Sequence, residues 1–286
     1  MAIESVGLAG NSLVQSSAGS TVQADVSGRQ EAQNAAVQSA QKASAVDTSR
    51  PVNAANAVQG AETEVEREQL EAAMLSVNRQ VGGVSALVAG RDMRYSGFNR
   101  VLDTKRNIGS LVKPAVYLSA LQLRQYHLGS VLVDEPVEVK DEQGNVWRPD
   151  NFDHQFRGEL PLYRAFSNSI NIPAVNLGLD IGVDKVANTL QGLGVESEIN
   201  QYPSLLLGAL ELSSYEVAQL YTTLANDGAY TRLTSISSLT DNSGKLLYQH
   251  RPQWQQRFPE DAMYMTKYGM KRVTKDGTGK RLNKHF

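Results

Sequence analysis

The chain changes character near residue 79, and only the part after that point has the composition of a packed domain. Residues 14–59 are dominated by Ala, Gln, Ser, Val and Asn, and the first aromatic residue is Tyr95. Such a segment cannot bury enough apolar surface to offset the entropy that it would lose on ordering. We therefore expect residues 1–78 to be a low-complexity, largely disordered segment and residues 79–286 to carry the globular part.

Two interpretations compete at this boundary. An apolar spacing typical of one helix face predicts a helix near residues 62–78. The strand-like segment 84–88 follows a Gly-Gly turn, and this pattern predicts instead a hairpin in which residues 74–78 pair with it. The sequence leaves both open.

Composition excludes several classes of function. A net charge of −2 gives no general attraction for nucleic acid or an anionic membrane. Without cysteine the chain has neither disulfides nor thiolate chemistry. We find no apolar run long enough to span a membrane and no signal-peptide pattern, so the chain as written is expected to stay in the cytoplasm.

Beyond residue 79, apolar periodicity and turn residues predict a mixed α/β (α+β) domain. A helix over 110–126 has apolar residues on more than one face and should be buried at the centre. Pro114 is tolerated there because the first turn lacks backbone partners for its N–H groups. Further helices are expected at 161–167, 173–181, 183–193, 215–226 and 260–274, and hairpins at 137–147 and 233–249.

The strongest chemical signal is Ser110-Leu111-Val112-Lys113 at the start of the central helix. A serine hydroxyl becomes a good nucleophile only when a neighbouring base removes its proton. A lysine three residues on returns to the same helix face, and burial would lower its pKa and free the neutral amine. The spacing alone is weak, since Ser39 and Lys42 match it equally well in the low-complexity segment. Gly109, Pro114 and the apolar helix distinguish Ser110.

A second candidate is Ser169-Ile170-Asn171, between two predicted helices. Its hydroxyl could relay a proton while its amide holds a substrate carbonyl. Ser76 and Asn78 have the same spacing, and such residues between helices are more often caps.

The other polar residues suggest no further site. The four histidines lack metal-ligand spacing, so neither a metal nor another cofactor is expected. Asp150 and Asp153 could form a pair of carboxylates, but their spacing is more simply explained by a polar loop. The basic residues after 270 read as a solvated face.

These segments together resemble the transpeptidase domain of class A penicillin-binding proteins of the 1B type. The resemblance covers residues 79–286 and rests on several motifs in the order of the family. They are Tyr95-Ser96-Gly97-Phe98-Asn99-Arg100, Arg106-Asn107-Ile108-Gly109-Ser110-Leu111-Val112-Lys113-Pro114, Trp147-Arg148-Pro149-Asp150-Asn151-Phe152-Asp153, Ser169-Ile170-Asn171-Ile172-Pro173-Ala174-Val175-Asn176-Leu177-Gly178, Leu206-Leu207-Gly208-Ala209-Leu210, Glu216-Val217-Ala218-Gln219 and Gly277-Thr278-Gly279.

The resemblance implies a serine β-lactamase/DD-transpeptidase-like fold and a role in cell-wall synthesis. Ser110 would be acylated by the D-Ala-D-Ala peptidoglycan stem peptide or by a β-lactam. Lys113 would be its base, and Ser169 and Asn171 the second element of the site. Trp147 and Asn151 would line the substrate groove.

Two departures from the family pattern accompany these motifs. The third motif of the family, Lys-Thr/Ser-Gly, is absent. We therefore expect an incomplete fold without the C-terminal sheet strands, impaired activity, and a Ser110 helix whose apolar faces are left uncovered. The second departure lies at the N-terminal side. The family is anchored in the inner membrane and acts on its periplasmic face. Residues 1–78 of this chain instead faintly resemble the N-terminal part of a FlaG-type flagellar protein.

Three hypotheses follow from these features. The chain is a serine transpeptidase or its acylation-competent remnant, a non-catalytic gene fragment or fusion product, or an interaction protein that works through its N-terminal helix.

Overall fold

The computed structural model describes residues 71–91, 97–140 and 144–284. The low-complexity segment up to residue 70, including Ser39 and Lys42, lies outside the described residues. Within the described ranges, no helix has both the length and the apolar character needed to cross a membrane.

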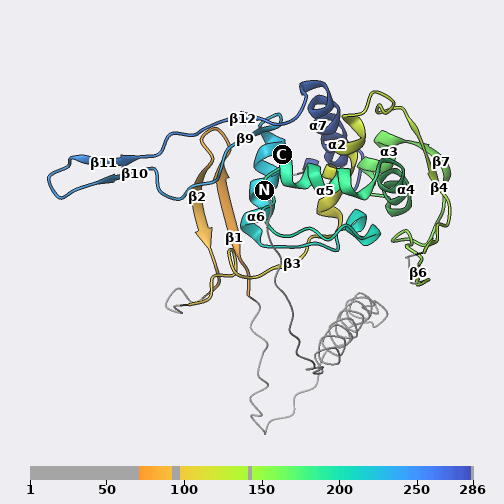
Figure 1. Ribbon diagram of the computed structural model, residues 1–286, viewed down its shortest axis with the longest axis horizontal. Coiled ribbons are helices and arrows are strands. Elements are labelled where there is room, and N and C mark those ends of the chain that lie inside the picture. The colour runs from red at the N-terminus through yellow and green to blue at the C-terminus, as the bar shows by residue number, and fades with distance from the viewer. Residues whose placement is uncertain (1–70, 92–96, 141–143, 285–286) are drawn as a thin grey trace, which may run out of the picture. The chain divides into compact units, whose positions relative to one another are not determined.

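The helices surround one buried helix, α2 (Figure 1). It packs against α4, α5 and α7, and all of its residues are buried. The prediction of a central helix is therefore confirmed, and the prediction of uncovered apolar faces on it is wrong. The helices are α2 (Lys113–Leu121), α3 (Leu162–Ser167), α4 (Asn171–Ile181), α5 (Val183–Gly192), α6 (Ser214–Ala225) and α7 (Glu260–Lys275), with 3₁₀ turns η1 (Gly109–Val112), η2 (Pro203–Leu207) and η3 (Lys280–Lys284).

Local sequence explains where these helices begin and end. Pro114 lies in the first turn of α2, as expected. The Ser213 hydroxyl accepts a hydrogen bond from the Glu216 N–H while the Glu216 carboxylate accepts one from the Ser213 N–H, a capping box that starts α6. Helix α2 stops at Leu121, short of the predicted residue 126, and beyond it the N–H groups of Leu123 and Tyr126 donate to carbonyls three residues back.

The strands within the described residues pair into short two-stranded antiparallel sheets. The mixed α/β class is confirmed. The pairs are β1 (Met74–Asn78) with β2 (Gly83–Val88), β3 (Arg106–Asn107) with β8 (Glu211–Leu212), β4 (Val131–Asp134) with β7 (Gly158–Pro161), β5 (Val139–Lys140) with β6 (Val146–Trp147), β9 (Ala229–Tyr230) with β12 (Gln255–Gln256), and β10 (Ser238–Thr240) with β11 (Leu246–Gln249).

The helix expected near 62–78 is wrong over Met74–Asn78, which is strand β1. Its backbone pairs with β2 across a tight turn in which Gly82 has a φ of +64°. Hydrogen bonding to a neighbouring strand outweighs the helical spacing of a few apolar residues. The alternative hairpin is thus confirmed, and the boundary expected at 78–79 falls inside it.

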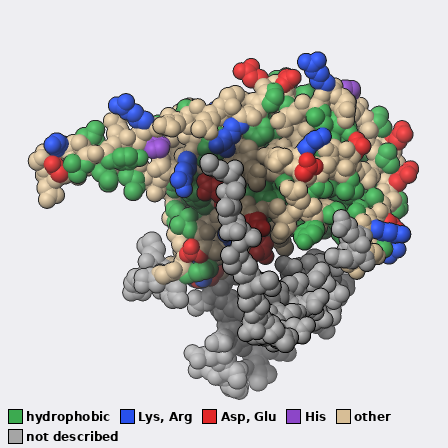
Figure 2. Space-filling model, in the orientation of Figure 1, with side chains coloured by type: hydrophobic (Ala, Val, Ile, Leu, Met, Phe, Trp, Pro, Cys, Tyr) green, Lys and Arg blue, Asp and Glu red, His purple; other side chains and the backbone are tan. Residues whose placement is uncertain are grey.

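The β10–β11 hairpin carries apolar side chains that stay in solvent (Figure 2). Leu239, Leu246 and Leu247 are each at least half exposed. Most of the buried apolar residues, by contrast, form one cluster around α2, which holds the start of α2 in a fixed position.

Candidate active site

Ser110 lies on η1, immediately before α2, and its side chain is exposed. Its hydroxyl makes no hydrogen bond to any residue that the structure describes. The turn that carries it is held from the other side by the segment after η2. The Ile108 N–H donates to the Leu210 carbonyl at 3.0 Å and the Gly109 N–H to the Gly208 carbonyl at 3.2 Å.

Gly208 is required at this contact by space and by backbone conformation. Its φ is +82°, in the left-handed region, and a Cβ added there would lie 2.0 Å from the Gly109 carbonyl oxygen. The glycine therefore lets the two backbones meet directly behind Ser110.

Lys113 is the buried charged group of the site, with 2% of its surface exposed. Its Nζ donates to the Ser169 carbonyl oxygen at 2.5 Å, to the Ser169 Oγ at 3.1 Å and to the Asn171 Oδ1 at 2.7 Å. An ammonium has three donors, so these three acceptors use its full capacity. Lys113, Ser169 and Asn171 are thus brought together by these hydrogen bonds.

The amine is not bonded to Ser110, although the spacing predicts that it reaches that hydroxyl. Among the described residues, the hydrogen bonds of the Lys113 amine go to Ser169 and Asn171. A carbonyl and an amide oxygen satisfy a buried ammonium better than one exposed hydroxyl does. Burial lowers the pKa of Lys113 to about 8, so the neutral amine is populated near neutral pH.

Ser169 presents two oxygens to Lys113 because its backbone is left-handed, with a φ of +53°. This conformation is costly for a residue other than glycine. It follows the end of α3, where the Ser169 N–H donates to the Phe166 carbonyl at 3.0 Å and the Ile170 N–H to the Ala165 carbonyl at 3.1 Å. Strain of this kind is typical of functional sites.

Asn151 positions Asn171 from within the protein. It is 3% exposed, and its Oδ1 accepts from the N–H groups of Asn171 and Ile172, both at 3.1 Å. It therefore caps α4 from a distant loop, in place of a local N-cap side chain. This differs from the groove-lining role expected for Asn151, because its buried amide is engaged with protein groups.

A buried aspartate that the sequence did not reveal fixes Asn151. Asp134, with no exposed surface, accepts from the Asn151 Nδ2 at 2.6 Å. The amide of Asn171 in turn donates to the Asp150 carbonyl at 2.8 Å. No motif marks Asp134, which only ends the alternating strand β4. Trp147, also expected in the groove, is half-buried on β6 and packs against the core.

The carboxylates of the remaining sequence candidates pair with other side chains. Asp150 pairs with His154 at 2.5 Å, and this hydrogen bond holds the pKa of Asp150 below its usual range. Asp153 pairs with Arg157, which lowers the pKa of Asp153. The two carboxylates thus do not form an acid–base couple. In the described ranges no cluster of His, Asp or Glu could hold a metal ion, and Ser76 and Asn78 lie on β1.

Comparison with known proteins gives a consistent set of relatives. Residues 72–285 match the family described as penicillin binding protein transpeptidase domain. The chain is 46% identical over 221 residues to penicillin-binding protein 1B of Vibrio cholerae serotype O1, covering 77% of this chain and 28% of that protein. It is 38% identical over 221 residues to penicillin-binding protein 1B of Escherichia coli K12, covering 76% and 26%. The chain therefore spans less than a third of the length of these relatives.

Solved structures share the fold. Penicillin-binding protein 1A from Haemophilus influenzae superposes with a TM-score of 0.71 at 23% identity, over 76% of this chain and 38% of that one. The PonA1 protein from Mycobacterium tuberculosis, in complex with penicillin V, gives a TM-score of 0.61 at 19% identity, over 71% and 55%.

Proposed function

Because the chain belongs to the penicillin-binding protein transpeptidase family, we propose that it acts by serine acylation in peptidoglycan synthesis. The acyl donor is the D-Ala-D-Ala end of a stem peptide, and a β-lactam takes its place. Ser110 is the nucleophile, Lys113 the base, Ser169 the proton relay and Asn171 the group that orients the base. The proposed place of action is the periplasmic face of the inner membrane, where the family acts.

The observation that carries this proposal is the buried Lys113 amine, held between Ser169 and Asn171 one helical turn after the exposed Ser110. A lysine buried without an ion-pair partner among the described residues destabilises a fold. Its lowered pKa gives it the one property that a general base requires, a neutral form near the working pH.

Loss of the proton changes the contacts of Lys113 in a way that suits this role. A neutral amine keeps two donors and gains a lone pair. It can then no longer donate to all three acceptors on Ser169 and Asn171. One contact is released, and the lone pair becomes free to accept the proton of Ser110.

The proposed reaction is balanced by a proton that returns to the leaving group. Ser110 Oγ attacks the carbonyl carbon while its proton passes to the Lys113 Nζ. When the C–N bond breaks, that proton reaches the leaving amine through the Ser169 Oγ, 3.1 Å from the Nζ. An acceptor amine or water then attacks the acyl-serine ester and releases Ser110.

Covalent labelling by a β-lactam tests the proposal directly. The penicillin V complex of PonA1 supports the choice of a penicillin as the probe. We expect intact-mass spectrometry to show one adduct, mapped to the peptide that carries Ser110 and absent from the Ser110→Ala variant. An adduct on Ser39, or no adduct on a chain that unfolds cooperatively, would contradict the assignment.

The rate of acylation should rise with pH through about 8 and then level off. The base is the neutral form of Lys113, whose pKa burial lowers to about 8, so protonation removes it at lower pH. Stopped-flow labelling with a fluorescent penicillin between pH 6 and 10 would measure this profile. A flat profile over that range would exclude Lys113 as the titrating base.

A further inference from the structure

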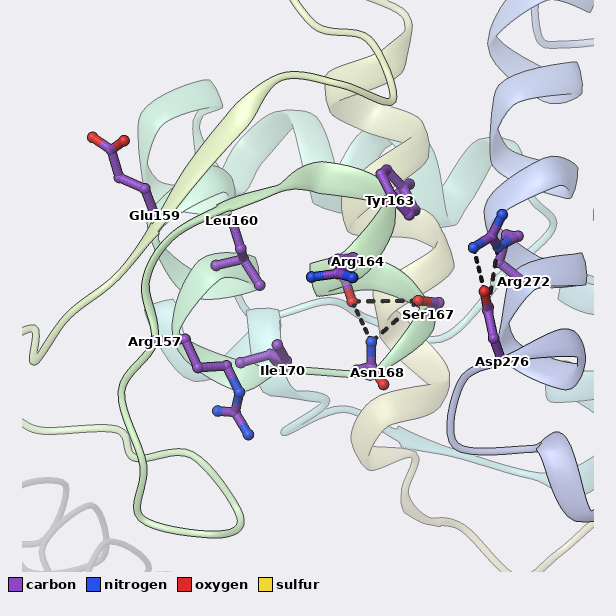
Figure 3. A pocket seen from close by; sticks show the side chains of 10 residues that line it. All are labelled: Arg157, Glu159, Leu160, Tyr163, Arg164, Ser167, Asn168, Ile170, Arg272 and Asp276. Carbon is purple, nitrogen blue, oxygen red and sulfur yellow. Dashed lines mark hydrogen bonds and ion pairs between the residues drawn. The ribbon is translucent and has the colours of Figure 1, made fainter.

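A pocket that does not include the proposed catalytic residues lies between α3, β7 and the end of α7 (Figure 3). Its volume is about 560 Å³, within the range of small-molecule sites. Ser110, Lys113, Ser169 and Asn171 do not line it.

Most charges around this pocket are already neutralised. Arg272 pairs with Asp276, and Arg157 pairs with Asp153 and with the buried Asp134. The positive charges of Arg272 and Arg157 are therefore already balanced by carboxylates of the protein.

Arg164 differs from the other two arginines. Its guanidinium makes no hydrogen bond or ion pair with any residue in the described ranges, and it lies on the pocket wall. Figure 3 shows the Glu159 carboxylate directed away from Arg164. Arg164 is the cation of this wall that is left without a carboxylate among the described residues.

The rest of the lining is mainly polar and includes two apolar side chains. Leu160 and Ile170 are buried side chains that line the pocket. The Asn168 amide is fixed by a hydrogen bond to the Arg164 carbonyl at 3.0 Å, and the Tyr163 ring stands beside Arg272. A single unmatched cation beside the two apolar side chains fits a ligand with one negative charge and an apolar body.

We infer that this pocket binds an organic monocarboxylate. The Arg164 guanidinium takes the carboxylate through two parallel hydrogen bonds, and the hydrocarbon part lies on Leu160 and Ile170. A dianionic phosphate fits less well, because one of its charges would remain unmatched beside Asp276. This inference does not depend on acylation of Ser110.

Hexanoate is a suitable probe, and side-chain NMR of the ¹⁵N-labelled 286-residue chain is the measurement. At constant ionic strength we expect a saturable shift of one arginine Nε–Hε signal, with a Kd of about 10 mM. Acetate, which has the head group alone, and hexanol, which has the apolar body alone, should each bind more weakly. Hexyl phosphate separates the two anion classes and should bind no better than hexanoate.

Variants test the assignment to Arg164. Arg164→Gln should weaken hexanoate binding by about tenfold or more. Arg164→Lys keeps the positive charge but loses the planar guanidinium that donates two parallel hydrogen bonds, so it should retain part of the binding affinity. Arg124→Gln, at an exposed arginine outside this pocket, is the matched control and should bind like the original chain. The inference is overturned if Arg164→Gln binds as tightly as the control, if hexanol binds as well as hexanoate, or if no saturable shift occurs.

Discussion

Lys113→Met is expected to slow penicillin acylation of Ser110 by about 10²–10⁴-fold, the contribution of a positioned general base. Methionine fills a similar volume in the core of α2 but cannot accept a proton. Ser110, the exposed turn around it and the contact between Gly208 and Gly109 are all left in place. The loss should therefore appear in the acylation rate constant, measured by stopped-flow labelling at pH 8.

The same substitution should raise the stability of the fold at pH 7. Burial lowers the Lys113 pKa to about 8, so the folded chain binds that proton less tightly than the unfolded chain does. The free-energy cost of burying the charged Lys113 amine is fully present below pH 8. It disappears as the pH rises towards about 10.4, the pKa of a lysine in the unfolded chain. Lys113→Met removes this cost but also removes the hydrogen bonds of Lys113. We therefore expect the free energy of unfolding at pH 7 to rise by about 1 kcal/mol.

Urea unfolding at pH 7 and pH 10 checks this result, with the gain shrinking at the higher pH. A variant that unfolds more easily than the original chain at pH 7 would show that Lys113 is mainly structural. A slower acylation rate in a more stable protein is the combination that only a catalytic role predicts.

Gly208→Ala is the second substitution with a large expected effect. A methyl group at this position would lie 2.0 Å from the Gly109 carbonyl oxygen and 2.5 Å from the Gly109 nitrogen. Backbone atoms cannot rotate away as a side chain does, so the whole Ser110 turn must move. We expect a loss of about 4 kcal/mol or more, which is a large part of the stability of an ordinary domain, together with loss of penicillin labelling.

Gly244→Ala is the matched control for this experiment. Gly244 has nearly the same φ, +83°, but nothing lies within 4 Å of an added Cβ. It should therefore lose only about 1–2 kcal/mol, the cost of a left-handed alanine. Urea midpoints of the two variants separate backbone strain from the clash, and equal losses would show that the close approach of Gly208 to Gly109 is unimportant.

Features that depend on nearby residues were predictable from the sequence. The position of Pro114 in the first turn of α2 follows a local rule and was confirmed. The capping box of Ser213 and Glu216, which the prediction did not include, is equally local, because its two residues lie three positions apart. The periodicity of α2 also predicts its burial, because apolar residues occur on more than one face. The hairpin at Met74–Asn78 was only one of two options, since pairing with β2 is not visible in a single segment.

Features that depend on residues far apart in the sequence were harder to predict. The motifs brought Lys113, Ser169 and Asn171 to attention, yet the sequence could not show that the amine faces Ser169 rather than Ser110. The left-handed backbone of Ser169 and the buried Asp134 beneath Asn151 carry no sequence signal of their own. Both arise from tertiary contacts that override local preference.

The contact between Gly208 and Gly109 has a consequence for how this chain folds. The Ser110 turn receives its backbone partners from residues that follow η2, and Lys113 finds Asn171 58 positions further along the chain. Closing such long loops costs entropy before any contact stabilises the product, so interactions of this range form slowly. Ser110 and Lys113 should therefore reach their final geometry late in folding, after α2 has already become helical.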